Sequence, residues 1–164
     1  MNKKWIQSLL PHRPPMLLVD SVLSLSPGRE LLASKTVTGD EPCFASIPGR
    51  TSAVAPYSNA LVIESLCQAG ALLCAATSEG CTAGRELLFG SIAAFRFHAC
   101  AYRGDTLYLH VRLDQFRPGS AVFSGQVRVH ESIIAEADQL LVVMRSRSAP
   151  SHFVPQDLPH TDFK

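Results

Sequence analysis

Two stretches in the second half of the chain alternate between apolar and polar positions. In DTLYLHVRLD, residues 105–114, leucine and valine occupy every second position, which is the period-two pattern of a half-buried strand. RPGS at 117–120 is typical of a turn, and alternation resumes in VFSGQVRVH, so the pattern predicts a hairpin with a slightly long loop. EADQLLVVMR, residues 136–145, predicts one more strand.

An earlier hairpin and one long helix are predicted in the first half. MLLVDSVLSL (16–25) and ELLASKTV (30–37) flank the turn SPGR. Residues 58–77 favour a helix that Ser58 or Asn59 can cap. Its apolar side chains surround the cylinder instead of forming one stripe, and such a helix is buried on most sides. Because that burial needs a sheet curled around the helix, we expect an α+β fold with a curved antiparallel sheet.

Composition narrows the class of protein further. The chain has 164 residues, of which 46% are hydrophobic and 18% charged, and this length suits one domain with its own core. We assign that domain to residues 1–146 and expect the proline-containing tail, 147–164, to be flexible. A net charge of +1 gives no reason to expect nucleic acid or a membrane surface as a partner. No signal peptide and no uninterrupted membrane span are apparent.

The cysteines bear on compartment and metal chemistry. There are five, an odd number with no CxxC pair: Cys43, Cys67, Cys74, Cys81 and Cys100. We interpret all of them as reduced packing residues of a cytoplasmic protein. Cysteine and histidine spacing typical of a metal site is absent, so we expect neither a metal nor a cofactor.

Glu64 is the one charged residue in LVIESLCQAGALLCAA, residues 61–76. No lysine or arginine lies one helical turn away to pair with it. Burying an unpaired carboxylate costs several kcal/mol, and a carboxyl group that stays protonated avoids this cost. Such an acid can deliver a proton, and the amide of Gln68, one turn on, could hold it or a water molecule. Alternatively, Glu64 faces solvent or meets an arginine from a strand.

Several blocks resemble the FabZ-type 3-hydroxyacyl-[acyl carrier protein] dehydratases. LLPHRPPMLLVDSVLSLSPG, residues 9–28, is similar to the opening of that family, and IESLCQAGALL, residues 63–73, to the start of its central helix. TVTGDEPCF, IAAFRF, YRGDTL and IIAEADQLLVV match further blocks in the same order. The resemblance covers residues 9–145 and implies a hotdog fold, a long central helix wrapped by an antiparallel sheet and paired through the sheet edge into a dimer.

The resemblance also implies a reaction and a site. In this family a histidine takes the α-proton of a 3-hydroxyacyl thioester, and a carboxyl group on the central helix assists departure of the hydroxyl group across the dimer interface. Glu64 falls on that carboxyl group and Gln68 on the family's glutamine, so both are the candidate catalytic residues. The implied partner is an acyl carrier protein or another acyl thioester.

The chain departs from the family at the histidine. The family has Gly-His-Phe-Pro-Gly, whereas anchoring on Pro48-Gly49 places Ser46 there and counting back from Glu64 places Arg50 there. A hydroxyl group is too weak a base and arginine stays charged, so neither side chain can abstract a proton unaided. We interpret His12 as structural and His98 as a surface residue. Lower-ranked candidates for substrate binding are Ser46, Gly49, Tyr57 and Asn59.

Three functions remain open from the sequence. The first is an acyl-thioester dehydratase of fatty-acid or polyketide biosynthesis, with Glu64 as acid and an altered or partner-supplied base. The second is a non-catalytic or half-site subunit, which as a heterodimer with a second hotdog protein would complete one site, whereas a homodimer would be nearly silent. The third is an acyl-thioester isomerase or binding module.

Overall fold

The computed structural model describes residues 1–45, 55–77 and 85–146. Three helices and six strands are assigned in this part of the chain. In chain order they are α1 (Lys3–Leu9), β1 (Ser21–Ser26), β2 (Glu30–Thr36), α2 (Pro42–Ala45), α3 (Asn59–Thr77), β3 (Arg85–Phe97), β4 (Thr106–Arg117), β5 (Ser120–Val129) and β6 (Ser132–Ser146).

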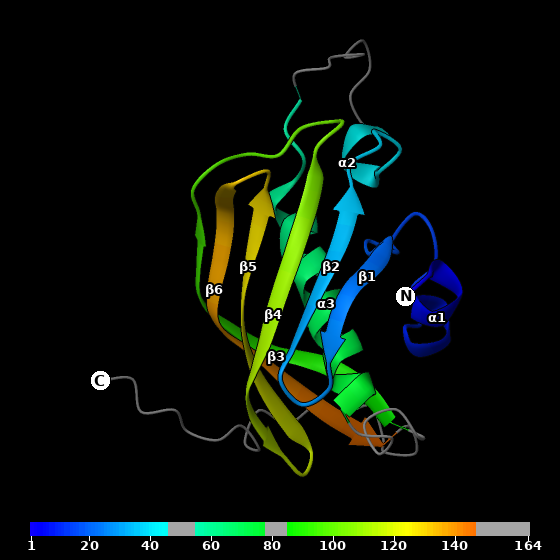
Figure 1. Ribbon diagram of the computed structural model, residues 1–164, viewed down its shortest axis with the longest axis vertical. Coiled ribbons are helices and arrows are strands. Elements are labelled where there is room, and N and C mark those ends of the chain that lie inside the picture. Colours follow the sequence, from blue (N-terminus) through cyan, green and yellow to red (C-terminus); the bar gives the residue numbers. More distant parts are fainter. Residues whose placement is uncertain (46–54, 78–84, 147–164) are drawn as a thin grey trace.

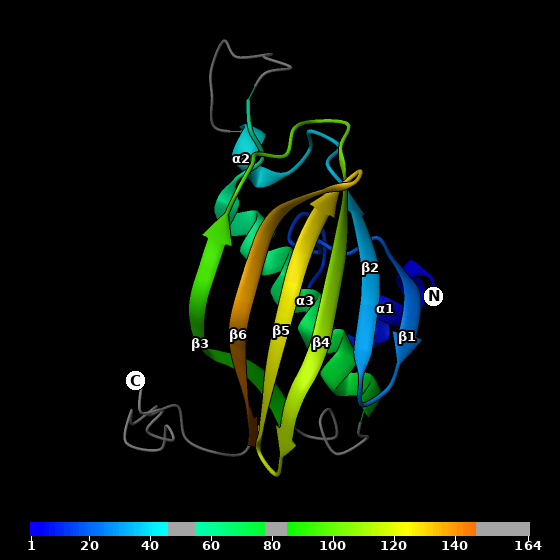
Figure 2. The same ribbon diagram turned by 60° about the vertical axis from the view of Figure 1, so that its left-hand side comes forward.

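The strands form one antiparallel sheet in the order β1-β2-β4-β5-β6-β3. The sheet curves around α3, which runs along its inner face, and α1 lies beside β1 at one edge (Figure 1). A turn of the molecule shows β3 at the opposite edge, with β6 as its neighbour (Figure 2). This arrangement confirms the expected α+β hotdog fold.

Helix α3 is the centre of the core, as its apolar surface predicts. The carbonyl of Ser58, one of the two predicted cap residues, accepts hydrogen bonds from the N–H groups of Leu61 and Val62. The helix begins at the next residue, Asn59. Every residue from Ser65 to Ala75 is buried. Its mean hydropathy of 1.6 and its 19 residues would also suit a membrane span, but a helix enclosed by its own sheet needs the same composition.

The sheet meets this helix through alternate side chains. On β4, Leu107, Leu109 and Val111 are fully buried, so the residues between them face away from α3. At Gly125 on β5 there is little room for a side chain between the neighbouring strand and α3. A Cβ atom there would lie 3.0 Å from the carbonyl oxygen of His110 and 3.2 Å from a methyl group of Leu66.

The predicted hairpins are present, with two corrections. The first strand, expected at 16–25, begins only at Ser21. Arg117 pairs with Ser120, so β4 and β5 are joined by a two-residue turn and not by the slightly long loop expected. Gly119 has φ +89°, a conformation that glycine adopts without strain. The pair Pro118-Gly119 therefore makes a tight turn by itself.

The cysteines differ in their surroundings. Cys67 and Cys74 are buried in α3, and Cys43 is partly buried, as expected of packing residues. Cys100 is exposed, so the interpretation of this residue as a packing residue is wrong. It lies in the irregular connection between β3 and β4, where the chain crosses the surface. Cys81 and the tail 147–164 lie outside the described residues.

Candidate active site

Glu64 lies on α3 just before the fully buried stretch. Its side chain is 34% exposed, which lies between the two alternatives that the sequence left open, a buried acid and a residue that faces solvent. It is neither isolated in solvent nor paired with an arginine from a strand. Its Oε1 lies 3.3 Å from Nε2 of His12, a residue 52 positions earlier in the chain. Glu64 therefore has a titratable neighbour that can pair with it.

Gln68 holds the same carboxyl group from one helical turn away. Its side chain is 1% exposed, and its Nε2 donates a 2.8 Å hydrogen bond to Oε1 of Glu64. The same Nε2 donates to the carbonyl of Met16, and Oε1 of Gln68 accepts from the N–H of Leu18. These two backbone groups determine which end of the amide is oxygen. The remaining N–H of Gln68 is thus directed at Glu64.

His12 reaches Glu64 because the segment after α1 is held along α3. Arg13 donates from its guanidinium to the carbonyls of Gln7, Leu10 and His12. These bonds secure the bend that follows α1, and Gln68 secures the chain beyond it. Together they place His12 over the start of α3.

The interpretation of His12 as structural therefore missed its contact with the candidate acid. One sequence feature pointed to His12, because LLPHRPP is among the blocks that carry the family resemblance. Nothing in the sequence indicates, however, that residue 12 folds against residue 64. The contact depends on a tertiary arrangement that only the packed segment reveals.

Among the remaining candidate residues, the structure describes Tyr57 and Asn59 and shows neither in contact with this cluster. Ser46 and Gly49, together with Arg50, lie outside the described residues. Asn59 is exposed at the first position of α3. The side chain of Tyr57 is buried, with 1% exposure, and its N–H donates to the carbonyl of Ala101. Tyr57 is thus a core residue that fixes the entry to α3.

Replacing Tyr57 by phenylalanine is expected to leave unchanged the turnover of a 3-hydroxyacyl thioester, the reaction that the family resemblance implies. Burial raises the pKa of the Tyr57 phenol above its usual value of 10, so this group cannot act as a base near neutrality. The ring packs near Phe44, with 6.4 Å between the centroids, and phenylalanine keeps that contact. We expect melting temperature and turnover close to the wild type. A large loss of turnover in a folded variant would return Tyr57 to the site.

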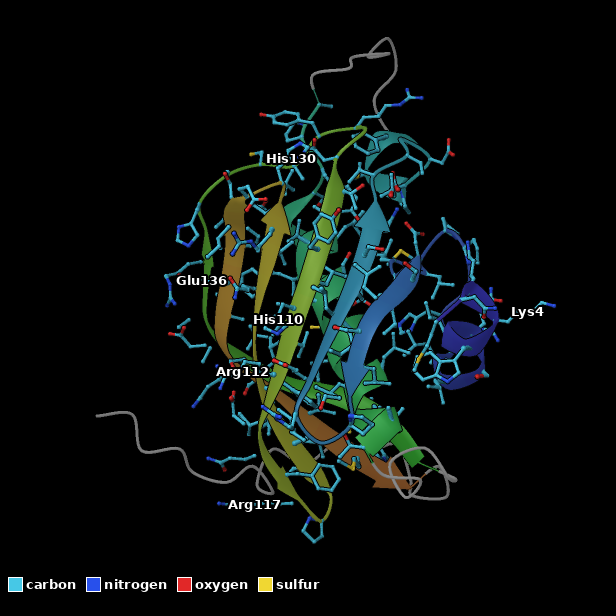
Figure 3. The ribbon with its side chains drawn as sticks, in the orientation of Figure 1. Lys4, His110, Arg112, Arg117, His130 and Glu136 are labelled. Carbon is cyan, nitrogen blue, oxygen red and sulfur yellow. The ribbon has the colours of Figure 1, made fainter. Side chains whose placement is uncertain are left out.

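A concave region lies on the outer face of the sheet, away from α3. It has a volume of about 440 Å³ and is lined by polar and charged side chains. His110 and Arg112 on β4 and Glu136 on β6 project on this side (Figure 3). The charges pair locally: His110 lies 3.1 Å from Glu30, and Arg96 binds both Glu136 and Asp138. This region is a paired polar surface, separated from Glu64 by the sheet.

The family follows from a comparison of the whole sequence. A family model for the FabA-like domain matches residues 10–138. The chain belongs to this family. Among its relatives, the 3-hydroxyacyl-[acyl-carrier-protein] dehydratase FabZ of Colwellia psychrerythraea is 38% identical over 133 residues, covering 81% of this chain and 87% of that protein. FabZ of Oleidesulfovibrio alaskensis is 37% identical over 144 residues, covering 88% and 92%.

Solved structures with low sequence identity share the FabA-like fold. The dehydratase heterocomplex ApeI:P from Xenorhabdus doucetiae superimposes with a TM-score of 0.71 at 17% identity, covering 87% of this chain and 91% of that chain. A hypothetical thioesterase protein with coenzyme A from Streptococcus pneumoniae has a TM-score of 0.56 at 9% identity, covering 78% and 88%. The His12–Glu64–Gln68 cluster therefore lies on a hotdog scaffold of the FabZ type.

Proposed function

We propose that this chain is a dehydratase-type subunit for 3-hydroxyacyl groups on acyl carrier protein, and that it supplies the acid half of a site shared with a second hotdog chain. One observation carries the proposal. Glu64 is held by Gln68 and His12 within one chain, while the family's histidine position contains no histidine by either alignment. These contacts support Glu64 as the acid of the reaction, and the sequence at the family's histidine position supports a base that comes from another chain.

The chemistry divides naturally between two chains. The base removes the α-proton of the thioester, a carbon–carbon double bond forms, and the bond to the β-hydroxyl oxygen breaks. Glu64 gives its proton to that oxygen, which leaves as water. The base has then gained one proton and Glu64 has lost one, and exchange with solvent restores both. A positioned acid or base of this kind typically contributes about 10²–10⁴-fold, so one half alone is a poor catalyst.

The edge strand β3 supports pairing with another chain. None of the residues from Leu87 to Phe97 is buried, although several are apolar. Leu88, Ile92 and Phe97 are each more than a third exposed. A long edge with apolar side chains and unpaired backbone groups is suited to pairing with a second sheet. The solved heterocomplex with the same fold is described as a dehydratase, which agrees with a mixed pair.

The setting that we propose is cytoplasmic fatty-acid or polyketide biosynthesis. The relatives named above are dehydratases of acyl-carrier-protein substrates. The described part of this chain offers the reaction's acid in a half-exposed position, where a substrate can reach it. Isomerisation of an acyl thioester would also need a base to move a proton, whereas simple binding of an acyl thioester would need none.

The test is dehydration of 3-hydroxybutyryl-[acyl carrier protein], followed as formation of the enoyl thioester. The chain is assayed alone and co-expressed with each hotdog protein of its genome that carries an intact Gly-His-Phe-Pro-Gly motif. The partner's own helix acid is replaced by glutamine, so that turnover depends on Glu64. We expect turnover only in one mixed pair. Full turnover by the chain alone, or none in any pair, would contradict the shared site.

A further inference from the structure

We propose that His12 is the positioning residue of Glu64: it holds one carboxylate oxygen and leaves the other for the substrate, and it is not the missing base. This inference rests on the function proposed above. It concerns a residue that belongs to the LLPHRPP segment and contacts the acid from outside α3.

Two contacts converge on a single oxygen of the acid. Nε2 of Gln68 lies 2.8 Å from Oε1 of Glu64, and Nε2 of His12 lies 3.3 Å from the same Oε1. With Oε1 approached from two sides, the carboxyl group cannot rotate freely. Oε2 is then the oxygen that can meet the β-hydroxyl group of a substrate. Fixing an acid in one orientation is a large part of what an active site contributes.

The ring of His12 is not arranged to act as a base. Its Nε2 faces the Glu64 carboxyl group. Its Nδ1 is enclosed and has no hydrogen-bond partner among the described residues. Although the side chain is 34% exposed, Nδ1 has no contact with solvent. A general base must come within hydrogen-bonding distance of the proton it removes, and neither ring nitrogen is free to do so.

His12 has a further effect after the proton has moved. Once Glu64 has protonated the departing hydroxyl group, a carboxylate remains beside Nε2. Nε2 lies 3.3 Å from Oε1, and a charged imidazole at this distance stabilises the carboxylate. Arg13 holds the carbonyl of His12, and Gln68 holds the backbone at Met16 and Leu18. The ring therefore meets the new charge without having to move.

The experiment compares His12→Phe and His12→Gln in the active pair. Phenylalanine keeps the bulk of the ring without an N–H group, whereas glutamine restores an N–H at a similar distance from the backbone. We expect His12→Phe to lower kcat by about 10- to 100-fold with KM nearly unchanged, the range for hydrogen bonds to charged groups. His12→Gln should recover most of the loss. In a Glu64→Gln background, His12→Phe should have little further effect.

His110→Phe is the matched control. His110 also lies about 3 Å from a glutamate, Glu30, and its side chain is 31% exposed, but it is on the outer face of the sheet. We expect its kcat to equal that of the wild type. His12 would be the base if two results came together. Both His12→Gln and His12→Phe would lose about a thousand-fold in kcat, and the wild-type chain would be active without a partner. If His12→Phe changed kcat and KM and also lowered the melting temperature, and if its loss of rate added to that of Glu64→Gln, His12 would be merely structural.

A spectroscopic measurement separates this inference from the proposed function. Nitrogen-15 shifts of the His12 ring report which nitrogen carries a proton, and they need no turnover. We expect Nε2 to be protonated, with its shift altered by Glu64→Gln. An unprotonated Nε2 would overturn the positioning role even in an active pair. A protonated Nε2 in a protein that dehydrates nothing would overturn the proposed function while retaining the contact.

Discussion

Replacing Glu64 by glutamine is expected to lower turnover of the proposed mixed pair by about 10²–10⁴-fold. Glutamine has nearly the same shape as glutamate and can still accept the hydrogen bond from Nε2 of Gln68. It cannot give a proton to the departing hydroxyl group. The measurement is the initial rate of enoyl thioester formation from 3-hydroxybutyryl-[acyl carrier protein], at saturating substrate.

Two controls make this result specific to the proton. The melting temperature of Glu64→Gln should stay close to that of the wild type, because the side chain is partly exposed and its amide partner is retained. Binding of a non-reactive acyl thioester should also persist. A variant that keeps more than about a tenth of the wild-type rate would contradict the role of Glu64 as the acid.

Replacing Glu41 by glutamine is expected to destabilise the fold by about 3–5 kcal/mol, the range for breaking a buried ion pair. Lys35 and Glu41 are each 4% exposed, and Nζ lies 2.6 Å from Oε1. Glu41 also accepts hydrogen bonds from the N–H groups of Thr38 and Gly39. Glutamine keeps an oxygen that can accept from Lys35 but not the negative charge, so the ammonium group beside the Thr36 carbonyl is left buried without a counter-charge. Chemical denaturation at pH 7 measures the loss.

The same pair predicts a pH dependence. Although burial acts to raise the pKa of Glu41, hydrogen bonds from Lys35 and the backbone hold it at about 2, below its ordinary value of 4.5. A lowered pKa in the folded state gives stability that is complete above pH 4.5 and is lost as the pH falls towards 2. The difference in the free energy of unfolding between the wild type and Glu41→Gln should therefore shrink by about 3 kcal/mol as the pH falls from 4.5 to 2.

The double variant Lys35→Met/Glu41→Leu is the control for this prediction. It removes both charges and keeps apolar bulk, and such replacements are often neutral or stabilising. We expect it to recover a large part of the loss seen in Glu41→Gln. A double variant as unstable as the single one would mean that the hydrogen bonds to Thr38 and Gly39, and not the unpaired ammonium, account for the effect.

Periodicity predicted most of the fold because most elements bury one definable face. The helix expected at 58–77 begins at Asn59 and ends at Thr77, and β4 shows the alternation that predicted it. Strand β3 is different. It is bulged at Gly90 and has a positive φ at Ala94, and no side chain in its described part is buried. Only the resemblance of IAAFRF to a family strand indicated it.

The candidate site was predictable only on one element. Glu64 and Gln68 are four residues apart, so helical geometry alone brings them together. His12 lies in a loop whose path is determined by Arg13 and by the backbone contacts of Gln68. The sequence does not contain that path in any local pattern. Residues 46–54, where the family's histidine would fall, lie outside the described residues.

The open edge of β3 has a consequence for how the chain persists in a cell. An apolar strand edge that is not covered is a template for aggregation and a signal for proteolysis. Leu88, Ile92 and Phe97 remain on such an edge in the single chain. Newly made copies that find no second sheet should be short-lived, so the abundance of this protein is expected to follow the synthesis of the proposed partner chain. Pulse-chase measurement of its half-life, with that chain present or deleted, reports this dependence directly.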